Sequence, residues 1–169
     1  TYSEGCNDDV NKFVWSGLGW NPKAGVDEIL RQYGRYFIGE HQAEGMAQGL
    51  LALERNWKGP LLTNSGVETT LTQFQEMERA ASPAELLNWR FQQALYRAYY
   101  DAFLRNRLIA ETAQQNEAME VLRQSKRIGT LPALEQAQAI LAQAAVNPAA
   151  ADLRTRVNEL AEALFQSIH

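Results

Sequence analysis

The sequence has few of the residues that build disulfide frameworks, metal centres or nucleophilic catalytic sites. Its 169 residues include one cysteine and two histidines. A single cysteine, Cys6, excludes an intramolecular disulfide framework, and His41, the only internal histidine, excludes a histidine-rich metal site. There is no Walker loop, no GxGxxG, no CxxC and no HExxH motif. The sequence therefore assigns no catalytic residue, no cofactor and no metal site.

Basic charge and long apolar runs are also lacking. Lys and Arg number 16 against 20 Asp and Glu, which gives a formal net charge of -4 and no basic footprint for nucleic acid. No apolar run reaches the roughly 18 residues of a membrane-spanning helix. Hydrophobic residues make up 46% and charged residues 21%, as in a soluble domain large enough to bury a core. We expect neither a nucleic-acid partner nor a membrane partner.

Strand patterns are missing as well, because no segment alternates apolar and polar residues between hairpin turns. Apolar residues recur instead at helical spacing between capping residues and breakers. The sequence predicts an all-α fold, with about seven helices in an irregular bundle and one domain over residues 1–169. The expected helices cover about residues 10–18, 26–38, 40–57, 65–81, 83–127, 130–146 and 148–168.

The longest of these helices is predicted over about residues 83–127. Ser82, Pro83 and Glu85 form a capping box with proline at the first helical position, and no Pro or Gly follows until Gly129. The absence of a breaker favours one helix over two helices joined by a bend. On this helix Asp101 stands four residues from Arg97 and from Arg105, and Arg90 falls on nearly the same face, which predicts a ladder of salt bridges.

The acidic residues near the start admit two interpretations. Glu4, Asp8 and Asp9 include carboxylates that could serve in pairs as general acid and base in glycoside hydrolysis. Acids are also favoured in the first turn of a helix, where they interact with its dipole. The structural interpretation is the favoured one, since the spacing of Glu4 and Asp8 is no specific signature.

Aromatic residues are unevenly distributed, because only Phe165 lies after Phe103. The N-terminal two-thirds therefore carry either the large-volume core or an aromatic surface. Exposed Trp and Tyr rings can stack on sugars, but at helical spacing core packing is the favoured interpretation. The residues concerned are Trp15, Trp20, Tyr33, Tyr36, Trp57, Trp89, Tyr96, Tyr99 and Tyr100.

Several segments resemble a known group of proteins. Residues 2–12 (YSEGCNDDVNK), 19–22 (GWNP), 26–30 (VDEIL) and 36–39 (YFIG) resemble the region after the catalytic barrel in bacterial proteins that are predicted to be glycoside hydrolases. These proteins are loosely similar to α-glucuronidases and combine an (α/β)₈ barrel with a helical domain. Residues 88–91 (NWRF) and 95–101 (LYRAYYD) resemble the long helix of that domain, so the resemblance covers about residues 2–110.

The resemblance implies a function that depends on a larger protein. Residues 2–5 would follow the last barrel strand, at the end of a barrel where active sites lie. Glu4, Asn7 and Asp8 are then the substrate-proximal candidates, near a sugar-binding cleft. The barrel is missing from this chain, so no catalytic pair can be assigned. The partner would be the missing catalytic barrel of the same parent protein, with carbohydrate as the ligand.

We therefore expect a helical accessory domain of a carbohydrate-active enzyme, which is not catalytic alone. On this hypothesis the chain is a fragment that starts after a barrel strand and ends within a helix. The location of the parent is open, with a secreted or periplasmic protein among the alternatives.

A stand-alone helical interaction module, which presents a groove to a partner helix or peptide, is the second hypothesis. An autonomous helical enzyme is the third and has the least support. An apolar patch near residues 1–20 would favour the first hypothesis, the accessory domain of a carbohydrate-active enzyme.

Overall fold

The computed structural model describes residues 8–167, and this part of the chain is all-α. It contains no strand and nine α-helices, of which α5 and α7 have four residues each and the other seven have twelve or more. The predicted fold class and the prediction of about seven helices are confirmed. The helices are α1 (Asp8–Trp20), α2 (Val26–Phe37), α3 (Ala43–Asn56), α4 (Gly66–Ala80), α5 (Pro83–Leu86), α6 (Trp89–Arg123), α7 (Ser125–Ile128), α8 (Thr130–Val146) and α9 (Ala151–Gln166).

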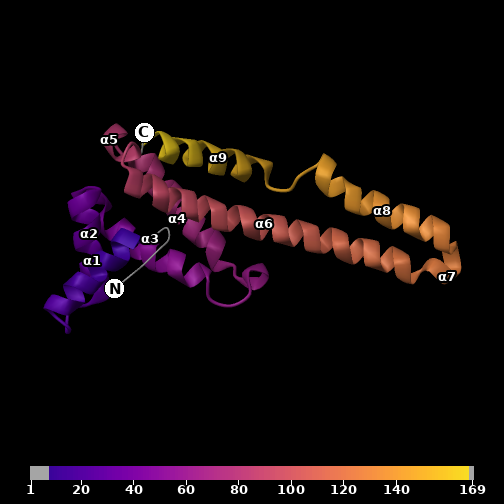
Figure 1. Ribbon diagram of the computed structural model, residues 1–169, viewed down its shortest axis with the longest axis horizontal. Helices are drawn as coiled ribbons and strands as arrows, with labels where there is room; N and C mark the ends of the chain where they lie inside the picture. The colour runs from indigo at the N-terminus through magenta and orange to yellow at the C-terminus, as the bar shows by residue number, and fades with distance from the viewer. Residues whose placement is uncertain (1–7, 168–169) are drawn as a thin grey trace.

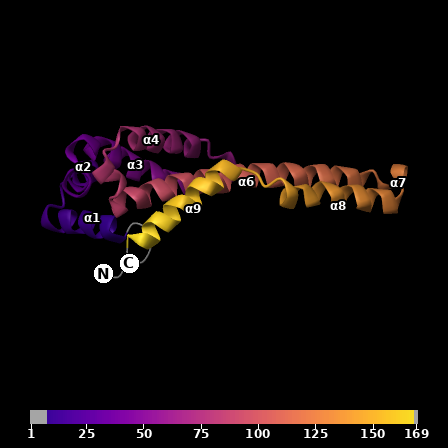
Figure 2. The same ribbon diagram turned by 90° about the horizontal axis from the view of Figure 1, so that it is seen from above.

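The 35-residue helix α6 is the spine of the molecule. Helices α3, α4 and α9 pack against its first half, α2 packs against α3, and α1 packs against α2 (Figure 1). Its second half is covered by α8, which runs back along it after the turn at α7 (Figure 2). We call residues 8–103 and 147–167 the body, and residues 104–146 the arm. The arm is a two-helix hairpin that projects from the body in both views.

The long helix is confirmed with shorter bounds than the predicted residues 83–127. The capping box at Ser82 forms as expected, with the Ser82 backbone N–H donating to Glu85 Oε2 at 2.7 Å, but α5 ends after one turn. Asn88 then adopts an extended backbone, and its side-chain oxygen accepts from the Arg90 N–H at 3.0 Å to start α6. Its Nδ2 donates to the Phe37 carbonyl at 2.6 Å, which ties this break to the end of α2. Asn88 thus supplies the cap that divides an otherwise helix-favouring segment.

The hydrophobic core lies in the body, between α2, α3, α4 and the first half of α6. Its largest fully buried side chains are Tyr33, Phe74, Phe91, Met46, Leu53, Leu95 and Val67. Two glycines let helices approach closely: a Cβ on Gly34 would lie 3.0 Å from the Ala43 Cα, and one on Gly49 would lie 2.8 Å from Phe74 Cζ. The buried residues of the arm are small, namely Ala118, Ala133 and Ala137. The bulky side chains of the core therefore lie in the body, whereas the arm packs through alanine.

Candidate functional site

The three substrate-proximal candidates fall at the start of the chain, and the structure places one of them. Glu4 and Asn7 lie outside the described residues. Asp8 is the first residue of α1, and its Oδ2 accepts from Lys12 Nζ at 2.6 Å, one helical turn further on. Its side chain is 31% exposed, so this pair is at the surface.

The neighbouring carboxylate, Asp9, has different partners from Asp8. Its Oδ2 accepts from the Tyr33 hydroxyl at 2.9 Å and from Arg90 Nε at 2.6 Å. These bonds join α1 to α2 and to the start of α6. Burial and the hydrogen bond to Asp9 together raise the pKa of the Tyr33 hydroxyl well above its ordinary value. The contacts support the structural interpretation of Asp9, since its carboxylate holds three helices together.

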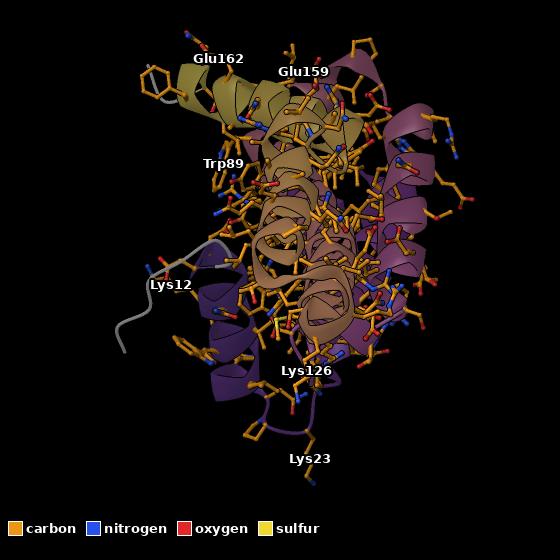
Figure 3. The ribbon with its side chains drawn as sticks, turned by 90° about the vertical axis from the view of Figure 1, so that its right-hand side faces the viewer. Lys12, Lys23, Trp89, Lys126, Glu159 and Glu162 are labelled. Carbon is orange, nitrogen blue, oxygen red and sulfur yellow. The ribbon has the colours of Figure 1, made fainter. Side chains whose placement is uncertain are left out.

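Arg90 also lies against two aromatic rings. Its guanidinium carbon is 4.3 Å from the centroid of Phe37 and 4.2 Å from that of Trp89, which are cation–π distances. Figure 3 shows Trp89 between α1, which carries Lys12, and α9, which carries Glu159 and Glu162. Since the Trp89 side chain is 39% exposed, this end of α6 presents an aromatic edge between two charged helices.

The predicted salt-bridge ladder forms at one rung only. Arg97 Nε donates to Asp101 Oδ1 at 3.2 Å, as the i,i+4 spacing predicts. Arg105 bonds Glu68 on α4 instead, at 3.1 Å, and Arg90 bonds Asp9 on α1. The prediction is wrong for these two arginines because neighbouring helices bring carboxylates within their reach. Cations along α6 thus attach other helices to the spine, which spacing along one helix cannot reveal.

Asp101 is the centre of a buried polar network that sequence reasoning missed. It is 2% exposed and accepts from Asn56 Nδ2 at 3.0 Å and from Trp57 Nε1 at 3.2 Å, besides Arg97. Asn56 in turn accepts from the Thr70 hydroxyl at 3.1 Å. The Arg97 guanidinium lies over one face of the Trp57 ring, 4.6 Å from its centroid. The buried carboxylate thereby fixes the orientation of a tryptophan that is 64% exposed.

The aromatic residues divide between core and surface. The predicted core packing is confirmed for Tyr33 and Tyr99, which are 2% and 7% exposed. Burial of Tyr99 and its hydroxyl bond to Glu78 raise the pKa of that hydroxyl. Core packing is wrong for Trp20 and Tyr36, which are 93% and 80% exposed, and for Trp57. Helical spacing identifies the side of a helix but not whether another element covers that side.

Trp20 and Tyr36 belong to one surface, which we call the α1–α2 face and define by Phe13, Trp20, Gln32 and Tyr36. A hollow of about 540 Å³ lies beside Trp20. A second hollow, of about 510 Å³, lies beside Tyr36, and Phe13 and Gln32 line both. The two exposed rings therefore border adjoining hollows on the same side of α1 and α2.

The described residues offer no metal centre. Among residues 8–167, no group of three His, Cys, Asp or Glu side chains is placed to hold a metal ion. His41 lies at the surface with Nε2 3.2 Å from Glu85 Oε2. Within the same residues, no helix combines the length and apolar character needed to cross a membrane.

Comparisons with protein-family models, curated proteins and solved structures found no match to this chain.

Proposed function

We propose that this chain is a helical accessory domain of a glycoside hydrolase, which packs on a catalytic (α/β)₈ barrel and is not catalytic alone. The observation that carries the proposal is the α1–α2 face, on which Trp20 and Tyr36 are almost fully exposed. Single exposed apolar side chains are ordinary, but clustered aromatic rings beside hollows are typical of a surface that another protein covers. The resemblance of residues 2–110 supports a barrel as the covering surface.

Burial of this face would be energetically substantial. A tryptophan or tyrosine that loses about 150 Å² of exposed surface contributes about 4 kcal/mol, before the costs of association are subtracted. Asp8 and Trp20 are the first and last residues of α1, so a barrel that contacts this helix along its whole length would also lie close to Asp8. Within the proposal, Asp8, with Glu4 and Asn7, lies near the sugar-binding cleft and contacts carbohydrate.

The reading frame that encodes this chain gives the first test. Eight alternating strands and helices encoded in frame before residue 1 are the expected result. A start codon directly before Thr1, or an upstream region of another fold, would contradict the proposal.

A pair of variants gives the second test. We expect W20S together with Y36S to lower the melting temperature of the barrel-containing protein and to leave that of the 169-residue chain unchanged. Leu87, which is 77% exposed and belongs to neither the α1–α2 face nor the arm, provides the control variant L87S. Equal effects of W20S/Y36S on both proteins would show that the α1–α2 face is not a docking surface.

A stand-alone helical interaction module is the second candidate, and the arm supports it. Leu131, Leu141 and Val146 are 73%, 52% and 76% exposed on α8, where they could receive an apolar partner helix. A chain encoded without a barrel, in which L131S with L141S abolishes partner binding and W20S does not, would favour this candidate.

A further inference from the structure

A cavity of about 470 Å³ lies where the arm meets the body. Its walls come from the middle of α6, the end of α8, the connection between α8 and α9, and the first turn of α9. The residues that matter for its chemistry are Phe103, Arg107, Glu111, Gln114, Asn147 and Arg154. This volume lies within the roughly 300–1,000 Å³ range of pockets that bind small molecules.

The cavity carries an uncompensated positive charge. Arg107 Nε donates to Glu111 Oε1 at 2.5 Å, so those two charges balance each other. The Arg154 guanidinium has no ion pair or side-chain hydrogen bond with any of residues 8–167, and neither has the side-chain amide of Gln114 or Asn147. A ligand with a negative group would therefore find one free cation, a second guanidinium and amide donors.

The remaining lining is apolar, and part of it is less exposed than the charged groups. Phe103, Ala110 and Ala144 are half-buried, whereas Arg107, Glu111 and Arg154 are exposed. The exposed polar groups thus surround a less exposed apolar part of the lining, which includes the Phe103 ring. Such a lining favours an organic molecule with a flat or apolar part over a bare inorganic ion.

The position of the cavity gives a ligand contacts with three separate segments. Arg107 is on α6, Asn147 directly follows α8, and Arg154 is on α9. The connection between the last two helices includes Ala150 at φ 56°, the left-handed region that residues other than glycine rarely adopt. A bound molecule would fix this connection against α6 and so join the arm to the body.

We propose that this cavity binds a small organic anion, with its carboxylate or phosphate group between Arg154 and Arg107 and its apolar part against Phe103. The assignment uses none of the residues of the α1–α2 face and does not depend on the docking of a barrel.

Benzoate, phenyl phosphate and the neutral benzamide are suitable probes, with amide chemical shifts of the 169-residue chain as the readout. We expect benzoate or phenyl phosphate to shift signals of residues around Phe103, Gln114 and Asn147, with a dissociation constant of about 1–10 mM for so small a molecule. Benzamide should bind about tenfold more weakly, because it cannot form charge-assisted bonds. Preference for benzoate assigns a carboxylate ligand and preference for phenyl phosphate assigns a phosphate ester; either supports the proposal.

R154Q tests the proposed role of the free guanidinium. We expect this variant to weaken binding of the preferred anion about tenfold. R123Q is the matched control, since the side chain of Arg123 is 68% exposed and lies outside the cavity. The proposal is overturned if benzamide binds as tightly as the anions, if R154Q and R123Q behave alike, or if the shifts spread over surface arginines. Circular dichroism of both variants verifies that the fold is kept.

Discussion

Replacement of Asp101 by alanine tests the buried network under Trp57. The variant removes the shared acceptor of Asn56, Trp57 and Arg97. Asn56 is 3% exposed, so its amide would stay unpaired at a cost of about 1–3 kcal/mol. The Arg97 side chain is 16% exposed and would lose its counter-ion, whereas the Trp57 indole can reach water. Together these losses predict a destabilisation of about 3–5 kcal/mol, the size found when one partner of a buried ion pair is removed.

Urea and thermal unfolding, followed by circular dichroism, measure this loss directly. For a chain of this length we expect the melting temperature of D101A to fall by about 10 °C. E117A is the control, because Glu117 is exposed on the same helix, and its effect should stay within about 0.5 kcal/mol. The Trp57 indole N–H resonance, assigned with W57F, should move in D101A. A loss below about 1 kcal/mol would refute the argument that Asp101 holds this network together.

Three further variants test other parts of the fold. G34A should destabilise the chain by about 1–3 kcal/mol in urea unfolding, because its Cβ would meet the α3 backbone, whereas G19A, with nothing within 4 Å, should be neutral or stabilising. Tyr33 keeps its proton to a higher pH folded than unfolded, so its contribution to stability is complete below about pH 10 and is lost as the pH rises further. In a series of melting temperatures at rising pH, Y33F should lose less stability above pH 10 than the unaltered chain does. Identical pH dependence of the two proteins would contradict this role of Tyr33. S82A should cost about 1 kcal/mol in urea unfolding by removing the capping box, and an unchanged midpoint would argue against that cap.

Local signals predicted most of the helices. The capping box at Ser82 starts a helix as its motif predicts, and Gly129 ends α7 as the first breaker after it. Asn88 breaks the predicted helix although no Pro or Gly is present, because its side chain caps the start of α6. The long helix is present, and it starts at Trp89, six residues after the predicted start at residue 83.

The candidate site was less predictable, because its contacts join residues far apart in sequence. Arg90 and Asp9 are 81 residues apart, and Asn56 and Asp101 are 45 apart. Periodicity reports which side chains share a helix face, but the partner across that face depends on tertiary packing. The exposure of Trp57 also depends on a tertiary contact. Its indole N–H donates to a carboxylate on another helix, while its ring stays in solvent.

Because the arm packs through alanine, it should unfold more readily than the body. The buried side chains of its hairpin are Ala118, Ala133 and Ala137, each of which contributes little more than a methyl group. The far end of α6 and all of α8 should therefore exchange their amide hydrogens through partial unfolding, while the aromatic core stays closed. A protease should cut first near Gly129 and leave the body folded. The single continuous helix α6 thus belongs to two regions of different stability, and its amides should show a gradient of protection along its length.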